Sequence, residues 1–200
     1  MAKIKLTKNE QKIQKDALKM YQRYLPTLTL KKQQLQTEIR AIDAKAREVR
    51  DARKALEKEF DEWIAVFADA ESFKRDTVRV SNIRKGTGNI AGVKIPIYEG
   101  ADFTRAEYDL YETPVWIDMA ADRMERALEL DLEAEVLDEQ VRLLSKELRT
   151  TTQRVNLFEK VKIPEAKENI RKISVFLGDE RVAAVVRSKI SKRKLEAEAK

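Results

Sequence analysis

Apolar residues recur every seven positions along the first third of the chain. The repeat runs through Leu28, Leu35, Ile42, Val49, Leu56 and Trp63, and positions four residues further on include Ile39, Ala46, Phe60 and Phe67. This spacing is typical of one helix of a coiled coil, whose buried seam repeats about every 3.5 residues. Thr7 and Glu10 have the spacing of a capping box. We therefore predict a helix that begins near residue 8 and runs to about residue 71.

The C-terminal half contains a second seam. Its spacings alternate between four and three residues through Leu137, Val141, Leu144, Leu148, Thr151, Val155 and Phe158. Two such seams in one chain can pack against each other. The predicted fold class is therefore mainly α, a long antiparallel two-helix coiled-coil hairpin.

The second seam changes phase once, near a proline. After Phe158 it resumes one residue late, at Ile163, and continues through Ala166, Ile170, Ile173 and Leu177. Val155, Ala166 and Leu177 then stand eleven residues apart, a spacing that relaxes a left-handed supercoil. Pro164 lies within the shift and Pro26 lies in the other arm, so we expect a local kink with the two prolines at comparable heights. Such a kink could bend the coiled coil away from a straight axis as part of its function, or it could be tolerated without a function.

Between the two helices the pattern changes to that of strands. β-Branched residues alternate through residues 76–100, interrupted by the sequence KGTGN at residues 85–89. We interpret this as a β-hairpin with its turn at residues 85–89, because no Gly-Lys-Ser/Thr or helix follows to make a phosphate loop. Residues 101–116 are expected to form an irregular or short-helical cover. The predicted domains are an N-terminal coiled-coil helix (1–71), a small head (72–114) and a C-terminal coiled-coil helix (115–200).

The composition agrees with long helices and excludes several kinds of chemistry. Charged residues make up 38% of the chain, which has only 5 glycines and 4 prolines and contains neither cysteine nor histidine. The chain therefore lacks thiol nucleophiles, disulfides, soft-metal ligands and the commonest general base. We predict no catalytic, cofactor or metal site. It also has no apolar run long enough to span a membrane and no signal-peptide pattern, so we expect a cytoplasmic protein.

Basic residues gather at both ends of the chain. Residues 1–35 contain nine Lys or Arg and two Asp or Glu, whereas residues 99–140 contain three and fourteen. Near the C-terminus, the candidate partner-binding residues are Arg187, Lys189, Lys192 and Arg193, which together with N-terminal lysines would form a positive tip. A basic helical hairpin could alternatively bind nucleic acid through phosphate contacts, or serve as a structural adaptor. Alternatively, each of these basic residues could simply be exposed to solvent and bind no partner.

Three segments carry a family resemblance that spans nearly the whole chain. The most specific is TTTQRVNLFEKVKIP, in which the matching positions are Thr151, Thr152, Arg154, Val155, Asn156, Glu159, Ile163 and Pro164. The segments NIAGVKIP (residues 89–96) and LTLKKQQL (residues 28–35) add to it. The chain resembles the D subunit, the central rotor stalk of V-type and A-type ATP synthases and ATPases.

The resemblance implies a non-catalytic shaft that transmits torque between the nucleotide-hydrolysing or nucleotide-synthesising hexamer and the membrane ion-translocating ring. The implied partners are the catalytic and regulatory subunits of the hexamer, the small F subunit of the stalk and the protein that joins the shaft to the ring. No nucleotide or nucleic acid is implied, and the protein would lie peripheral to the membrane on its cytoplasmic side. Further candidate partner contacts are Arg154, Asn156 and Pro164 in the C-terminal motif and Asn89, Gly92 and Lys94 in the hairpin. Arg154 and Asn156 could instead bond across the coil.

Overall fold

A computed structural model describes residues 4–63, 77–106 and 116–198. It is mainly α-helical, with helices α1 (Lys8–Trp63), α2 (Ile117–Leu157) and α3 (Ile163–Glu198) and a hairpin of strands β1 (Val78–Ile90) and β2 (Val93–Arg105). The chain forms two compact units, which we describe separately. The hairpin unit comprises residues 32–149, and the terminal unit comprises residues 1–31 and 150–200.

The N-terminal helix begins where its capping sequence predicts. The backbone N–H of Glu10 donates to Thr7 Oγ1 at 3.3 Å, which satisfies one of the free donors of the first turn. α1 then continues through Pro26 without a change of helix type. The predicted end near residue 71, together with Phe67, lies outside the described residues.

Two antiparallel helices form the core of the hairpin unit. Ala46 and Val49 of α1 pack with Leu130 and Leu137 of α2, and Leu35 packs with Leu144 further along. All six residues are buried. The seams predicted from the heptad spacing are therefore confirmed in this unit.

The hairpin turn lies later in the chain than the sequence pattern indicates, after residues 85–89. Residues 85–89 belong to β1 and pair with β2, so the predicted turn is wrong. The chain reverses at Ala91 and Gly92, whose φ values are +51° and +82°. Positive φ at both central residues is the geometry of a type I′ turn, which matches the twist of the flanking strands. The two glycines of KGTGN are strand residues, and their missing side chains leave room for Glu99 and Ile97 of the opposite strand.

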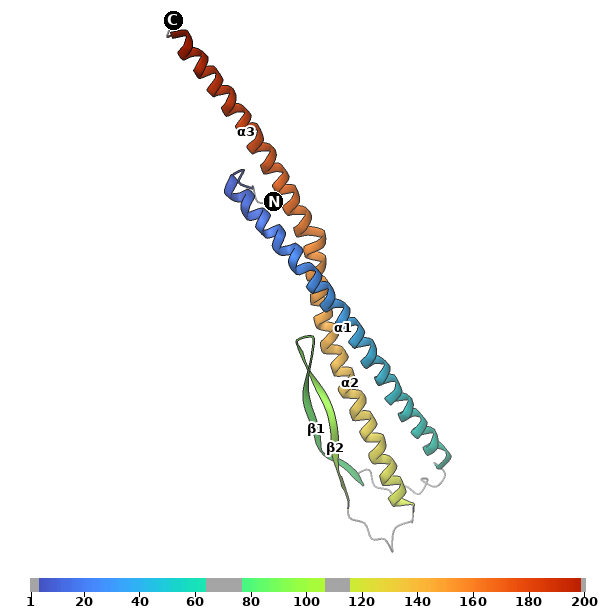
Figure 1. The fold of residues 1–200 in the computed structure, drawn as a ribbon. Coiled ribbons are helices and arrows are strands. Elements are labelled where there is room, and N and C mark those ends of the chain that lie inside the picture. Colours follow the sequence, from blue (N-terminus) through green and yellow to red (C-terminus); the bar gives the residue numbers. More distant parts are fainter. Residues whose placement is uncertain (1–3, 64–76, 107–115, 199–200) are drawn as a thin grey trace. The chain divides into compact units, whose positions relative to one another are not determined.

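The second strand is longer than predicted and lies against α2. Residues 101–105 continue β2 instead of forming an irregular cover, because they pair with β1 from Ile83 to Val78. The hairpin runs beside α2 (Figure 1), with Ile95 in the core next to Leu144. Gln140 of α2 also donates through Nε2 to the Pro96 carbonyl at 2.5 Å. The hairpin is thus an integral layer of its unit.

In the terminal unit the second seam passes through a π-helical turn. Thr151 and Val155 are buried before it and Ala166, Asn169 and Ile173 after it. Residues Phe158–Lys162 form the π-turn, in which the Ile163 N–H bonds to the carbonyl five residues earlier, that of Phe158. A π-turn accommodates one extra residue, so the one-residue delay in the seam is absorbed here. The predicted eleven-residue supercoil is not needed to explain the shift.

Cross-helix contacts place the two prolines at different heights, contrary to our prediction. The rings of Tyr21 and Phe158 lie 5.1 Å apart, and Asn169 Nδ2 donates to Gln14 Oε1 at 3.5 Å. Pro164 therefore lies opposite the stretch between Gln14 and Tyr21, whereas Pro26 lies beyond Tyr21. α1 passes through Pro26 as ordinary α-helix, whereas the π-turn directly precedes Pro164 and coincides with the phase shift of the seam.

Candidate partner-binding surfaces

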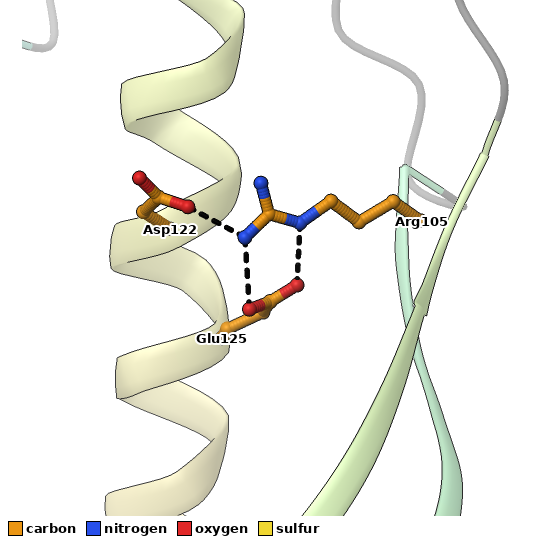
Figure 2. Close-up of polar contacts among 3 residues, drawn as sticks. All are labelled: Arg105, Asp122 and Glu125. Carbon is orange, nitrogen blue, oxygen red and sulfur yellow. Dashed lines mark hydrogen bonds and ion pairs between the residues drawn. The ribbon is translucent and has the colours of Figure 1, made fainter.

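The base of the β-hairpin is fastened to α2 by one arginine. Arg105, the last residue of β2, donates to Glu125 through Nε at 2.6 Å and through Nη2 at 2.9 Å, and to Asp122 through Nη2 at 2.5 Å. Figure 2 shows the guanidinium between the two carboxylates. The hydrogen bond to Glu125, followed by that to Asp122, raises the pKa of Arg105. With Gln140 further along α2, these contacts fix the position of the hairpin within its unit.

Ion pairs brace the two helices of the hairpin unit across their seam. Cations of α1 meet carboxylates of α2 in three pairs: Lys45 with Glu133 at 2.8 Å, Arg53 with Asp131 at 3.2 Å, and Arg50 with Asp138. A fourth pair, Arg123 with Glu59 at 3.0 Å, has the opposite polarity. Part of the acidic segment is thus neutralised internally, which leaves less free negative charge than the sequence alone indicates.

A shallow groove of about 260 Å³ lies between α1, β2 and α2 in the same unit. Its lining includes Ile42, Tyr98, Glu133 and Val136. The Tyr98 hydroxyl is buried and has no hydrogen-bond partner among the described residues. Desolvation, and then the charges of Glu129 and Glu133, raise the pKa of Tyr98. In residues 4–63, 77–106 and 116–198, no cluster of three or more acidic side chains is placed to hold a metal ion.

The candidate residues at the C-terminal end lie on an exposed stretch of α3. From residue 178 to residue 197 every residue except Ala183 is exposed. α3 extends beyond the N-terminal end of α1, which leaves its last turns uncovered (Figure 1). Arg187, Lys189, Lys192 and Arg193 lie here, and Lys192 pairs with Glu196 at 3.8 Å. Large apolar residues are exposed on the same stretch: Val182, Val185, Val186, Ile190 and Leu195. The end of α3 therefore exposes apolar as well as basic side chains.

The other candidate residues are exposed but do not form one site. Arg154, Asn156 and Pro164 are exposed, and no cross-coil bond of Arg154 or Asn156 is found within the described part of the chain. In the hairpin, Asn89 Oδ1 accepts from the Gly92 N–H at 2.9 Å, so this pair stabilises the turn. Lys94 is exposed on the neighbouring strand position.

Comparison with known proteins decides the family. The model of the family described as the D subunit of ATP synthase matches residues 10–193. The chain belongs to this family. It is 46% identical over 195 residues to the D subunit of the V-type ATP synthase of Borreliella burgdorferi, covering 98% of this chain and 96% of that protein. It is 36% identical to the protein of the same name from Chlamydia muridarum over 98% of this chain and 97% of that protein.

Several features of this member of the D-subunit family could not be read from apolar spacing. The Arg105 contacts and the Gln140 bond join segments that are distant in the sequence, and no local pattern marks them. The exposed apolar residues of α3 could have been found from the sequence, because valines and an isoleucine occur after Leu177, where the seam ends. None of the described helices is long and apolar enough to span a membrane.

Proposed function

We propose that the chain is the central rotor shaft of a V-type or A-type rotary ATPase and transmits torque between the nucleotide-processing hexamer and the membrane ion-translocating ring. Membership of the D-subunit family supports this role. The observation that carries it is the packing of two antiparallel helices on a buried seam, braced by ion pairs on both sides. Interdigitated side chains and cross-helix pairs resist sliding and twisting of one helix against the other.

The exposed end of α3 is proposed to insert into the hexamer of catalytic and regulatory subunits. Its uncovered apolar residues would meet apolar parts of a sleeve, and Arg187, Lys189, Lys192 and Arg193 would meet carboxylates or carbonyls there. An off-axis rod contacts each surrounding subunit differently, and differential contact is what shifts an equilibrium between open and closed states. The shaft itself is proposed to be non-catalytic, located on the cytoplasmic side and peripheral to the membrane.

The hairpin unit is proposed to hold the stalk contacts. The small F subunit of the stalk and the protein linking the shaft to the ring are the proposed partners. The hairpin, with exposed Asn89 and Lys94 near its turn, is one candidate surface. Its attachment to α2 through Arg105 and Gln140 would carry a load on the hairpin into the coiled coil.

A cross-linking experiment tests the rotor function. The chain has no cysteine, so Lys192→Cys introduces a single thiol at the exposed end of α3. A cysteine placed in the facing subunit of the hexamer would allow a disulfide to form in the assembled complex. We expect ATP turnover to stop when the disulfide forms and to return on reduction, because a shaft fixed to its sleeve cannot rotate.

Lys54→Cys, at an exposed position in the hairpin unit, is the control and should leave turnover unchanged under the same oxidation. Full turnover with the Lys192 position completely cross-linked would rule out rotation. Failure of the chain to assemble with the hexamer, together with tight nucleic-acid binding at physiological salt, would support a nucleic-acid arm instead.

A further inference from the structure

The β-hairpin has one covered edge and one open edge. On the covered side, Gln140 of α2 donates through Nε2 to the Pro96 carbonyl of β2 at 2.5 Å. Arg105 of β2 bonds to Glu125 of α2. β1 lies on the other side of the hairpin, and Val78 is its only buried residue. Within the described part of the chain no strand pairs with the outer side of β1, so this side can accept a further strand.

The register of the hairpin fixes which backbone groups of β1 point toward the open side. Ile90 and Val93 flank the two-residue turn, so they form a hydrogen-bonded pair, and hydrogen-bonded and non-hydrogen-bonded pairs alternate from there. Thr87 and Pro96 are the third pair beyond, which makes theirs a non-hydrogen-bonded pair. The bond from Gln140 agrees, because it shows that the Pro96 carbonyl points away from β1. The N–H and C=O of Thr87 therefore point away from β2.

The same alternation gives β1 a short row of outward-pointing donors and acceptors, here called the open edge: Lys85, Thr87 and Asn89. All three residues are exposed. No hydrogen bond from their outward N–H or C=O groups to another element is found in residues 4–63, 77–106 and 116–198. The pairing of β1 with β2 has no irregularity between Lys85 and Ile90, so the outward groups keep the regular spacing that a pairing strand requires.

The strand that carries the open edge is cationic. β1 contains no Asp or Glu and has three basic residues: Arg79, Arg84 and Lys85. Arg84 pairs with Asp102 of β2, whereas Lys85 forms no ion pair among the residues that the structure describes. Lys85 is therefore the charge of the open edge that a partner can neutralise.

Two carboxylates from other elements lie in this region without pairing with Lys85. Glu139 of α2 lines a groove with Lys85 but pairs with Arg142 at 2.6 Å. Glu99 of β2 fills the space beside the α-carbon of Gly86. A strand that pairs with the open edge should therefore carry a carboxylate facing Lys85, because opposite charges on neighbouring strands stabilise the pairing.

We propose that the open edge of β1 accepts an extended segment of a stalk partner protein as a third strand, with a carboxylate of that segment facing Lys85. The proposal rests on the proposed rotor function and specifies how the hairpin would hold one of its stalk contacts. Main-chain hydrogen bonds would supply the binding, as in other cases of strand addition. A second copy of the chain is a poorer occupant, because pairing two β1 strands would bring two cationic strands without carboxylates into one sheet.

The test compares hydrogen exchange of the full-length chain alone and within the assembled ATPase complex, measured by mass spectrometry at single-residue resolution. In the isolated chain the amides of Lys85, Thr87 and Asn89 should exchange rapidly, because they point away from β2. In the complex they should exchange at least about tenfold more slowly, because they would then bond to the added strand. The amides of Gly86 and Gly88, which point toward β2, should be protected in both states.

Thr87→Pro tests whether the protection comes from a strand. Proline removes the outward N–H of residue 87 but no hydrogen bond of the hairpin, and Pro96 already occupies the facing position in β2. The melting temperature should therefore change little. In the complex, the amides of Lys85 and Asn89 should lose their added protection. Thr87→Ala is the matched control, because it changes the same side chain, keeps the N–H and should retain the protection.

The outcomes separate this inference from the proposed function. If the chain does not assemble with the ATPase, the rotor function is overturned and the inference falls with it. If it assembles but the three amides exchange equally fast in both states, only the strand pairing is overturned. Protection that survives Thr87→Pro would show that side chains cover the edge. Protection that rises with the concentration of the isolated chain would show pairing with a second copy, and either result would overturn the proposal.

Discussion

At the scale of single residues, the backbone conformation at a glycine determines how its replacement changes stability when no neighbouring atom is in the way. Gly92 has a φ of +82°, and a Cβ added there would meet no other atom. Gly178 is equally uncrowded but lies within α3. The two glycines therefore offer the same substitution in two backbone conformations.

Alanine at these two glycines should have opposite effects on stability. Gly92→Ala should destabilise the protein by about 1 kcal/mol, because a non-glycine residue is strained in the left-handed region. Gly178→Ala should stabilise it by about 1 kcal/mol, because alanine is the better helix former. Chemical denaturation of both variants measures the difference. Equal effects of the same sign would contradict the positive φ at the hairpin turn.

Removal of the Tyr98 hydroxyl should stabilise the hairpin unit. The buried hydroxyl has no partner among the described residues, so Tyr98→Phe should raise the free energy of unfolding by about 1 kcal/mol at neutral pH. Burial raises the pKa of Tyr98 in the folded state. The folded state therefore resists ionisation, and stability should be lost as the pH rises above the ordinary tyrosine pKa of about 10.

Unfolding curves measured between pH 7 and about pH 11 check this expectation, with Tyr24→Phe as the control because Tyr24 is exposed. The alkaline loss of stability should be smaller in Tyr98→Phe than in the control. An equal loss in both variants would show that Tyr98 does not contribute.

At the scale of elements, the π-turn of residues Phe158–Lys162 keeps the seam in register. The seam spacing alternates between four and three residues except for one spacing of five, between Phe158 and Ile163. The wide turn lies at this spacing. Thr151 and Val155 before it and Ala166 and Ile173 after it are consequently all buried.

Deletion and insertion at the π-turn should therefore differ. Deleting the exposed Val161 removes the extra residue, so the segment can become ordinary α-helix with the seam still in phase, and the melting temperature should change little. Inserting an alanine at the same place would require a second wide turn and should destabilise the protein by about 1–3 kcal/mol. Thermal unfolding of the two variants tests this. A deletion as harmful as the insertion would mean that the turn has another cause.

The sequence predicted the helices better than it predicted the hairpin. Heptad spacing identified Leu35, Ala46, Val49, Leu137 and Leu144 as seam residues, because burial along a helix repeats with a fixed period. The hairpin turn was misplaced because Gly86 and Gly88 look like turn residues, whereas Ala91 is an unusual choice for a positive φ. The π-turn left a visible trace as a delay in the seam, but spacing alone could not distinguish a wide turn from a changed supercoil. At the end of α3, the sequence analysis identified the basic residues but missed the exposed apolar residues.

At the scale of the whole molecule, family membership and the exposed chemistry of the terminal unit point to a protein that works within an assembly. The basic and apolar residues at the end of α3 are not needed for packing within their unit. Their removal should thus affect assembly function without affecting the fold.

Deletion of Ser191–Lys200 tests this separation. It removes Lys192, Arg193, Lys194 and Lys200 together with Glu196 and Glu198, and no buried seam residue. The melting temperature should be unchanged and the hexamer should still bind, whereas ATP-driven ion transport in the reconstituted complex should fall. The intact chain should bind DNA only weakly and lose that binding as salt is added. Unchanged transport would mean that the last turns of α3 take no part in coupling.

The polarity of the cross-helix ion pairs also bears on how nascent chains choose their partners. In the hairpin unit, α1 contributes Lys45, Arg50 and Arg53, and α2 contributes the matching carboxylates. If the α1 helices of two chains paired with each other, these cations would lose the α2 carboxylates that they pair with here. Apolar heptad seams by themselves discriminate poorly between partner helices. Complementary charges beside the seam make the pairing specific. The ion pairs should therefore favour the pairing of an α1 helix with an α2 helix over the pairing of two α1 helices, even when many copies are synthesised together.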